Sequence, residues 1–113
     1  MYYKNWALII PLANEEQDFK VFIDAVKFVI DEIPPGKVYL VVDKASKDKT
    51  RQLCENLSKE DERFQTIWSP SNRNVVDAYI EGLRHAYKND HDIFIEMDAG
   101  LSHDPRAIPM FLR

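Results

Sequence analysis

The stretch Ile93-Phe94-Ile95-Glu96-Met97-Asp98-Ala99-Gly100-Leu101-Ser102-His103-Asp104-Pro105 carries the most informative pattern in this sequence. Its first five residues are mostly apolar and predict a buried strand that ends just before Asp98. A polar turn follows, and Asp104 and Pro105 then predict the N-cap and the first residue of a helix. A strand that ends in an acidic residue before such a turn is typical of α/β enzymes that bring a metal ion and a phosphate together. Asp98 is therefore the first candidate site residue.

Apolar runs alternate with helical patterns along the whole chain. The runs cover residues 6–12, 38–42, 64–68 and 93–97. Each is nearly continuous, as expected for strands that are buried on both faces of a parallel sheet. The alternation predicts an α/β fold of three layers, αβα, with a mostly parallel sheet in a single domain over residues 1–113.

The first helix is predicted over residues 15–33, before the stop Pro34-Pro35-Gly36. Its apolar residues recur at steps of three and four and form one stripe: Phe19, Phe22, Ile23, Val26, Val29, Ile30 and Ile33. A second helix is expected from about Asp48, with Ser46 and Asp48 as capping residues and with Leu53, Cys54 and Leu57 turned inward.

The third helix is predicted to begin after Asn72, which we expect to be its N-cap. One face of this helix is mostly apolar and is expected to be buried: Val75, Tyr79, Gly82, Leu83 and Ala86. Because glycine is unfavourable inside a helix by about 1 kcal/mol relative to alanine, Gly82 predicts a close approach to another backbone.

Composition excludes several classes of protein. Of the 113 residues, 45% are hydrophobic and 30% charged, and the net charge is -4 with the 15 Lys and Arg residues scattered. These values predict a globular protein without a nucleic-acid or anionic-membrane surface. Cys54 is the single cysteine, so no intrachain disulfide forms, and a small buried residue is expected. No secretory signal or long apolar run is present, and a cytoplasmic location is expected for this segment.

Polar residues follow every predicted strand. Four loops carry them: Pro11-Leu12-Ala13-Asn14-Glu15, residues 43–50, residues 69–74, and Asp98-Ala99-Gly100. In a parallel sheet these loops meet at the carboxyl edge, where ligands bind. Taken singly, Asn14, Glu15, Ser46 and Asp48 are also ordinary helix-capping residues, and Arg73 is an ordinary solvated charge. The four loops together favour a binding site.

These motifs resemble the family 2 glycosyltransferases. The resemblance rests on Pro-x-x-Asn-Glu at Pro11, on Val-Val-Asp-x-x-Ser-x-Asp-x-Thr around Asp43, and on Asn72 followed by Ala78, Gly82 and Ala86. Met-Asp-Ala-x-Leu-Ser-His-x-Pro around Asp98 completes the order. It spans residues 8–112 and is strongest to the polyprenol- and dolichol-phosphate sugar transferases.

The resemblance implies the N-terminal, nucleotide-sugar-binding half of a GT-A domain, which is Rossmann-like and has the strand order 3-2-1-4. It implies that Asp98 is the catalytic residue that holds Mg²⁺ or Mn²⁺ on the donor diphosphate. The nucleotide-sugar-binding positions it implies are Pro11, Ala13, Asn14, Glu15, Asp43, Lys44, Ser46, Asn72, Arg73, Asp98, Ala99 and Gly100.

The chain departs from the family pattern in two important places. Lys44 stands where the family usually has a second acid after Asp43, and Gly100 replaces the second carboxylate of the family's Asp-x-Asp. Ser102, Glu96 or Asp104 are candidate replacement ligands, whereas His103 is expected to be a turn residue. A smaller change puts Asn74 at a glycine position of the family. We therefore expect a weakened metal site with Asp98 as its principal ligand.

The resemblance implies transfer of a hexose from a GDP- or UDP-sugar to polyprenol phosphate or a saccharide, with inversion at C1. We expect the 113-residue chain to be inactive alone, because the acceptor side lies outside it. The alternative is a degenerate module that binds nucleotide weakly or acts as a scaffold. A dinucleotide-binding dehydrogenase is excluded, because no Gly-x-Gly-x-x-Gly follows the first strand.

The fourth strand is expected to leave an unpaired sheet edge beside Met110, Phe111 and Leu112. Such an edge pairs readily with another chain, so a homodimer or poor solubility is predicted. If the full-length protein has a membrane anchor, its place is expected at the cytoplasmic face of that membrane.

Overall fold

The computed structural model describes residues 5–68, 71–99 and 104–112 of the chain. Within them, four parallel strands form one sheet in the order β3-β2-β1-β4, which confirms the predicted order. The strands are β1 (Trp6–Leu12), β2 (Gly36–Val42), β3 (Phe64–Trp68) and β4 (Ile93–Glu96). The longer helices are α1 (Phe19–Ile30), α2 (Thr50–Glu60) and α3 (Val75–Lys88). A short 3₁₀ turn, η1 (Pro105–Ala107), leads into α4 (Ile108–Phe111).

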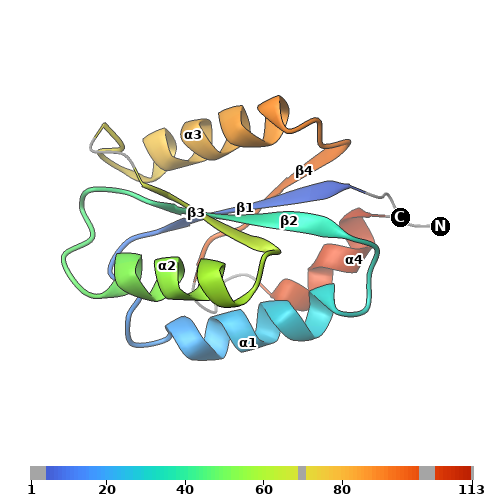
Figure 1. Cartoon of the computed structure of the whole chain (residues 1–113), viewed down its shortest axis with the longest axis horizontal. Helices are drawn as coiled ribbons and strands as arrows, with labels where there is room; N and C mark the ends of the chain where they lie inside the picture. Colours follow the sequence, from blue (N-terminus) through green and yellow to red (C-terminus); the bar gives the residue numbers. More distant parts are fainter. Residues whose placement is uncertain (1–4, 69–70, 100–103, 113) are drawn as a thin grey trace.

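Helices cover both faces of the sheet, as the predicted αβα layering requires. Figure 1 shows α3 on one face and α1, α2 and α4 on the other. Every residue of β1 is buried, and β1 pairs in parallel with both β2 and β4. A strand in this position has to be apolar on both faces, which explains why its sequence does not alternate.

The two faces of the sheet have cores of different composition. Alternate residues of β1 point to opposite faces, so Leu8 and Ile10 join the larger core, which α1, α2 and α4 cover. Ala7 and Ile9 point to the smaller core under α3. The predicted stripe of α1 is confirmed, with Phe19, Phe22, Ile23, Val26, Val29 and Ile30 buried and Ile33 partly buried.

The fully buried residues of α3 are small, which lets the helix pack closely against the sheet. Ala78, Gly82 and Ala86 are its buried residues. A Cβ atom at Gly82 would lie 2.5 Å from Cγ2 of Ile9 and 3.1 Å from Cγ2 of Val41. The close approach predicted for Gly82 is therefore to strand side chains rather than to a backbone. Val75 was expected in this face but is 47% exposed.

The observed ends of the helices differ from the predicted ends where loops contact each other. Helix α1 begins at Phe19 rather than at residue 15, because the backbone N–H groups of Glu15 and Glu16 donate to Thr50 Oγ1 and Asp48 Oδ2. These two N–H groups are fixed by the next loop instead of by a helix. At the other end α1 stops at Ile30, and the N–H of Ile33 donates to Ile30 in a tight final turn.

The predicted N-cap of α3 was wrong by two residues. The side chain of Asn74, not that of Asn72, accepts a hydrogen bond from the N–H of Asp77 at the start of α3. Asn72 is instead buried, and its carbonyl accepts a hydrogen bond from the N–H of Lys44. The predicted cap at Asp104 is confirmed, because its carboxylate accepts from the N–H of Arg106 at the start of η1.

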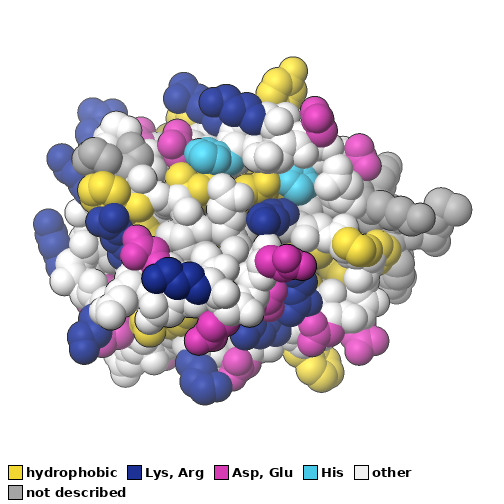
Figure 2. Space-filling model, in the orientation of Figure 1, with side chains coloured by type: hydrophobic (Ala, Val, Ile, Leu, Met, Phe, Trp, Pro, Cys, Tyr) yellow, Lys and Arg dark blue, Asp and Glu magenta, His cyan; other side chains and the backbone are white. Residues whose placement is uncertain are grey.

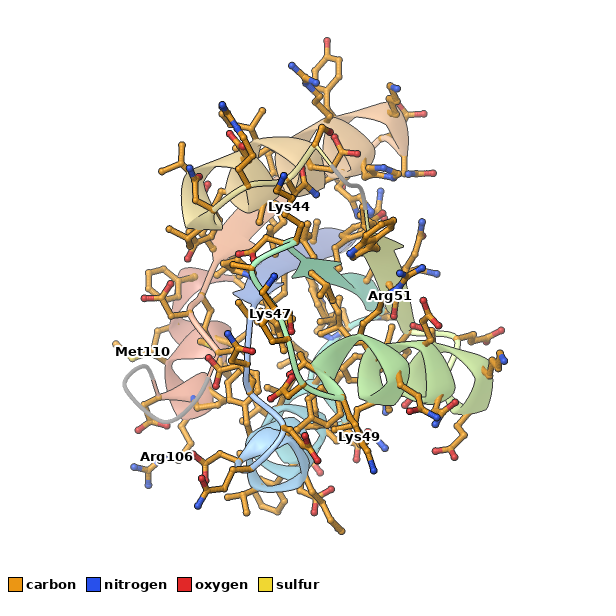
Figure 3. All side chains as sticks on the ribbon, turned by 90° about the vertical axis from the view of Figure 1, so that its left-hand side faces the viewer. Lys44, Lys47, Lys49, Arg51, Arg106 and Met110 are labelled. Atoms are coloured by element: carbon orange, nitrogen blue, oxygen red, sulfur yellow. The ribbon has the colours of Figure 1, made fainter. Side chains whose placement is uncertain are left out.

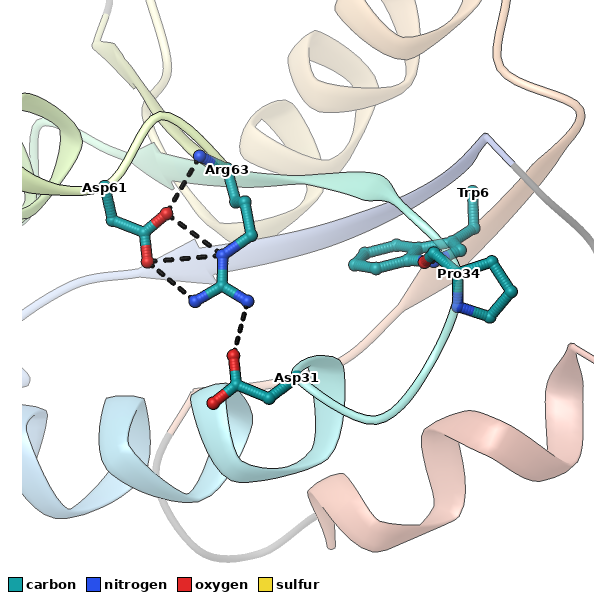
Figure 4. Close-up of polar contacts among 5 residues, drawn as sticks. All are labelled: Trp6, Asp31, Pro34, Asp61 and Arg63. Atoms are coloured by element: carbon teal, nitrogen blue, oxygen red, sulfur yellow. Dashed lines mark hydrogen bonds and ion pairs between the residues drawn. The ribbon is translucent and has the colours of Figure 1, made fainter.

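Two polar contacts close the amino end of the sheet (Figure 4). The indole N–H of Trp6 donates to the carbonyl of Pro34 over 2.6 Å. The guanidinium of Arg63 lies between the carboxylates of Asp61 and Asp31, at 2.8 and 2.6 Å. The hydrogen bond from Arg63 is the main cause that lowers the pKa of Asp61. This end of the sheet is therefore held by satisfied polar groups.

Cys54 is fully buried in the larger core. Burial is the main cause that raises the pKa of its thiol to about 12. The thiol is therefore protonated at neutral pH, which confirms the prediction of a small core residue rather than a reactive group.

At the surface, Lys and Arg side chains are interspersed with Asp and Glu on the face that Figure 2 shows. In the described ranges, no helix combines the length and the apolar character needed to cross a membrane.

Candidate functional site

The loops that follow the four strands meet at the carboxyl edge of the sheet. Figure 3 faces this edge, with Lys44 beside α3 and with Lys47 and Lys49 further along the β2–α2 loop toward α1 and α2. The arrangement follows from the parallel order of the strands, because parallel strands end at the same edge. The predicted site residues therefore come from segments far apart in sequence but share one edge.

An acidic cleft of about 290 Å³ opens at this edge. Its walls come from the end of β1 and the loop after it, from the residue after β2, from the start of α3 and from the segment after β4. The lining residues are Pro11, Leu12, Ala13, Glu15, Asp43, Val75, Asp98 and Ala99. Six of these eight were predicted as nucleotide-sugar-binding residues. Three of the lining residues, Glu15, Asp43 and Asp98, bring carboxylates and give the cleft its acidic character.

The pKa of Glu15 reflects the burial and the negative charge around this residue. Burial is the largest cause that raises its pKa, and the negative charges of Asp18, Asp48 and Asp98 add to it. Among the described residues, no Lys or Arg side chain forms an ion pair with Glu15. Carboxylates that repel one another in this way accept a cation or a proton readily.

Asp43 is held rigidly at the end of β2. Only 5% of it is exposed, and its Oδ1 accepts a hydrogen bond from the N–H of Ala45 over 2.8 Å. The N–H of Asp43 donates to the carbonyl of Leu12, which ties it to β1. Asp43 is therefore fixed by hydrogen bonds where it lines the cleft.

Asp98 is the second residue after β4, and the N–H of the intervening Met97 still donates to the carbonyl of Ile9. The hydroxyl of Tyr79, on α3, donates to Oδ1 of Asp98 over 2.7 Å. Burial is the largest cause that raises the pKa of Tyr79, and the bond to Asp98 adds to it. The candidate metal ligand is thus held by the sheet on one side and by α3 on the other.

Asn14 and Ser46, which were also predicted to bind the nucleotide sugar, bond to each other's loops instead of lining the cleft. The N–H of Asn14 donates to Ser46 Oγ, and its amide donates to the carbonyl of Ala45. The N–H of Lys47 donates back to Asn14 Oδ1 over 2.7 Å. Asn14 also has a φ of 56°, a conformation that asparagine adopts more readily than most residues. These bonds give both residues a bracing role between two loops.

Asp48 confirms its predicted role at the start of α2. Its Oδ1 accepts a hydrogen bond from the N–H of Thr50 over 2.9 Å, and its Oδ2 accepts one from the N–H of Glu16. Burial acts to raise the pKa of Asp48, but these hydrogen bonds outweigh that effect and lower it. Asp48 therefore caps α2 and holds the β1 loop at the same time.

A second cleft, of about 450 Å³, holds three more of the predicted residues, Lys44, Asn72 and Arg73. Its walls come from two loops and from α3: Lys44, Ser71, Asn72, Arg73, Asp77, Ile80, Glu81 and Arg84. Arg73 bonds to Asp77 at 3.0 Å. The Nδ2 atom of Asn72 is buried and finds no hydrogen-bond partner among the described residues. Nine residues of the predicted nucleotide-sugar set thus line an acidic cleft or a more basic one, whereas Asn14 and Ser46 line neither.

Only some of the candidate metal ligands lie within the described residues. Within residues 5–68, 71–99 and 104–112, no group of three or more His, Cys, Asp or Glu side chains is placed to hold a metal ion. Asp104, a candidate replacement ligand, is engaged by Arg106 through both carboxylate oxygens. Glu96 is exposed on β4 and does not line the cleft. Gly100, Ser102 and His103, for which expectations were stated above, lie outside the described residues.

Tyr79 was missed as a site residue. From the sequence it was expected only in the buried face of α3, and it does pack against the smaller core. The available signal was chemical, since a tyrosine in a face otherwise made of small and aliphatic residues brings a hydroxyl that needs a partner. Arg84 in the second cleft was also missed, and nothing in the helical pattern separates it from an ordinary exposed arginine.

Comparison with known proteins shows which family the chain matches. Residues 7–113 match the family model described as glycosyl transferase family 2. The chain is 32% identical over 104 residues to the undecaprenyl-phosphate mannosyltransferase of Micrococcus luteus. The aligned region covers 92% of this chain and 41% of that protein. It is 27% identical over 106 residues to the polyprenol monophosphomannose synthase of Mycolicibacterium smegmatis, covering 93% of this chain and 38% of that protein.

The chain thus spans about two fifths of the length of both relatives. The family match, in contrast, covers almost all of the chain and includes every loop of the carboxyl edge. With the parallel sheet order β3-β2-β1-β4, it agrees with the GT-A fold expected from the motifs. The chain belongs to glycosyl transferase family 2.

Proposed function

We propose that this chain is the donor-binding part of a glycosyltransferase that takes a hexose from a GDP- or UDP-sugar. The observation that carries the proposal is the meeting of Glu15, Asp43 and Asp98, from the ends of three strands, around one cleft of a family 2 chain. An acidic cleft repels the diphosphate of such a donor unless a cation lies between them. The charge of the site therefore argues for a donor that arrives with a divalent metal ion.

Asp98 is the residue that we propose as the principal ligand of Mg²⁺ or Mn²⁺. Carboxylate oxygens suit both ions, and Mg²⁺ sites commonly use one or two carboxylates with phosphates and water. The arrangement around Asp98 fits a site of this kind, which needs no complete protein cage. When bound, the cation neutralises the negative charge that develops on the leaving diphosphate. Glu15 and Asp43 make the cleft attractive to the cation and exclude an unaccompanied anion.

The names of the two relatives favour mannose as the sugar and a polyprenol phosphate as the acceptor. In such a transfer, an acceptor phosphate oxygen attacks C1 of the sugar from the face opposite the leaving group. The new C1–O bond forms as the C1–O bond to the diphosphate breaks, so the nucleoside diphosphate leaves and C1 inverts. A saccharide acceptor would react in the same way but would also lose a hydroxyl proton. The part proposed for this chain is to bind and orient the donor.

Lys44, Asn72 and Arg73 are proposed to contact the nucleoside end of the donor. The hydrogen bond from the N–H of Lys44 to the carbonyl of Asn72 joins the β2 loop to the segment before α3, which supports a shared role. Lys44 and the amide of Asn72 bring hydrogen-bond donors to the second cleft. The carbonyl oxygens of guanine or uracil are suitable acceptors for such groups.

The proposal is tested by isothermal titration of the chain with GDP and UDP, each with Mn²⁺ and with EDTA. We expect metal-dependent binding of one nucleotide, and a loss on the order of 100-fold in the Asp98→Asn variant. Asp92→Asn is the matched control, because Asp92 is an exposed residue just before the amino end of the same strand. Equal affinity in Mn²⁺ and EDTA would contradict the metal assignment.

The alternative function, a degenerate module that binds nucleotide weakly or acts as a scaffold, is favoured by one feature of the described residues, the lack of a three-ligand metal group. Absence of metal-dependent binding to either nucleotide would support it. Because the chain spans about two fifths of its relatives, we expect no sugar transfer by the chain alone. Transfer of labelled mannose to polyprenol phosphate by the 113-residue chain would overturn that expectation.

We infer that the chain associates with itself through the edge of the sheet at β4. Phe94 on this strand is 39% exposed, and Met110 is 71% exposed. Leu112, which was also expected beside this edge, is fully buried in the larger core. Light scattering over a range of concentrations should show a dimer, and a monomer throughout would contradict the inference.

We further propose that the protein lies in the cytoplasm or at the cytoplasmic face of a membrane.

A further inference from the structure

The bond between Tyr79 and Asp98 suggests a role that neither side chain has alone. The Tyr79 hydroxyl donates to Asp98 Oδ1 over 2.7 Å, and Asp98 lines the acidic cleft. Tyr79 itself does not line this cleft. It therefore reaches the site through Asp98, as an outer partner of a candidate metal ligand.

The position of the Tyr79 ring is set by the packing of α3. Tyr79 packs against the smaller core, and Gly82 lies three residues later on the same helix. Because a Cβ at Gly82 would meet Ile9 at 2.5 Å, only the absence of a side chain there lets α3 lie this near β1. Ala78, next to Tyr79 in sequence, is fully buried. The phenol is consequently held by a rigid contact between helix and sheet.

The backbone of Asp98 is anchored separately from its carboxylate. The N–H of Met97 donates to the carbonyl of Ile9 over 3.0 Å, which extends the contact between β4 and β1 to the residue before Asp98. With the main chain fixed there, the direction of the carboxylate still depends on rotation about the side-chain bonds. The hydrogen bond from Tyr79 restricts that rotation.

We propose that Tyr79 is a positioning residue that holds the Asp98 carboxylate in the orientation that binds the divalent cation of the donor. The inference rests on the proposed function. Outer partners of this kind orient ligating groups, and their removal typically lowers metal affinity by about 10- to 100-fold. Orientation matters more where carboxylates are few, and Gly100 replaces the second acid of the family motif in this chain.

The test is the Tyr79→Phe variant, which removes the hydroxyl and keeps the ring. Nucleotide titrations are run at several Mn²⁺ concentrations and in EDTA, with GDP and with UDP. We expect the apparent affinity for Mn²⁺ to fall about tenfold, with the affinity measured in EDTA unchanged. Tyr87→Phe is the matched control, because Tyr87 lies on the same helix and is 77% exposed.

The outcomes separate the inference from the proposed function. Metal-dependent binding by the wild type with an unchanged Mn²⁺ dependence in Tyr79→Phe would overturn the inference and leave the proposed function intact. An equal loss of affinity in Mn²⁺ and in EDTA would also overturn it, because a purely structural defect would act on both. Absence of metal-dependent binding by the wild type would overturn both proposals. Thermal melting of each variant shows whether the fold is retained.

Discussion

Acidic side chains act in opposite ways at the two ends of the sheet. At the amino end, Arg63 lies between Asp61 and Asp31, and its hydrogen bond lowers the pKa of Asp61. At the carboxyl end, burial and the charges of neighbouring acids raise the pKa of Glu15. Negative charge therefore stabilises the fold at one end and opposes it at the other. Such a difference is expected when one end is structural and the other binds a cation.

The largest predicted effect is at the amino end, in the variant Gly36→Ala. A Cβ at Gly36 would lie 2.1 Å from Cδ2 of the Trp6 indole, whose N–H is fixed to Pro34. Because neither ring nor strand can move freely, we expect a loss of about 3 kcal/mol in the free energy of unfolding, measured by urea denaturation. Pro35→Ala is the control, at an exposed neighbour.

Gly36→Ala also tests whether the two ends are independent. The fraction that remains folded should bind nucleotide as the wild type does, because Gly36 lies at the opposite end from the acidic cleft. A variant that is as stable as the wild type would show that the amino end is less rigid than its contacts indicate.

The next largest effect is expected for Asp61→Asn, which removes the main carboxylate partner of Arg63. A partly buried pair of this kind contributes about 1 kcal/mol. Because the folded-state pKa of Asp61 is lowered, the contribution is present above the ordinary aspartate value of about 3.9 and is lost as the pH falls through the folded-state pKa. Denaturation curves at neutral and at strongly acidic pH should show the difference between variant and wild type shrinking in acid.

The control for Asp61→Asn is Asp24→Asn, because the ion pair of Asp24 with Lys20 is highly exposed. We expect that variant to differ little from the wild type at any pH. If the effect of Asp61→Asn persisted undiminished in acid, it would have to come from lost packing rather than from charge.

The smallest effect, and the one with the opposite sign, is expected for Glu15→Gln. Because the folded-state pKa of Glu15 is raised, its favourable contribution is complete below the ordinary glutamate value of about 4.3 and is lost as the pH rises through the folded-state pKa. At neutral pH the variant should be as stable as the wild type or more stable by up to about 0.5 kcal/mol. This gain should disappear in acid.

Glu15→Gln sharpens the comparison when stability and binding are measured on the same samples. Nucleotide affinity in Mn²⁺ should fall although stability does not, which is the pattern of a residue kept for binding. Glu32→Gln, at an exposed position after α1, is the control for loss of one charge. A variant that is less stable at neutral pH would show that Glu15 supports the fold, and the contrast between the ends would fail.

Local pattern was enough for most of the fold. Strands β1 and β3 have the predicted bounds, because a continuous apolar run between polar loops is visible without any partner. Strand β2 begins at Gly36, two residues before its predicted start, and β4 ends at Glu96, one residue early. The buried stripe of α1 was also predictable, since its residues recur with the period of a helix.

The main residues of the site were predictable from the sequence, but their division between two clefts was not. The motifs named Glu15, Asp43 and Asp98 together, and these do share a cleft. No motif indicated that Lys44 would line a different cleft from Asp43, the residue just before it. Successive residues at a strand end point in different directions, so the wall that each one joins depends on the three-dimensional path of the loops.

By itself, the sequence determined which segments are strands and helices, how the strands follow one another, and which acids stand at their ends. Only the tertiary structure decided where α1 begins, which asparagine caps α3, and which side chain orients Asp98. The reason is distance along the chain. The N–H of Glu15 bonds to Thr50 from 35 positions away, and Tyr79 bonds to Asp98 from 19 positions away. Periodicity reports the burial of a residue within its own segment, whereas such bonds exist only after the segments have packed together.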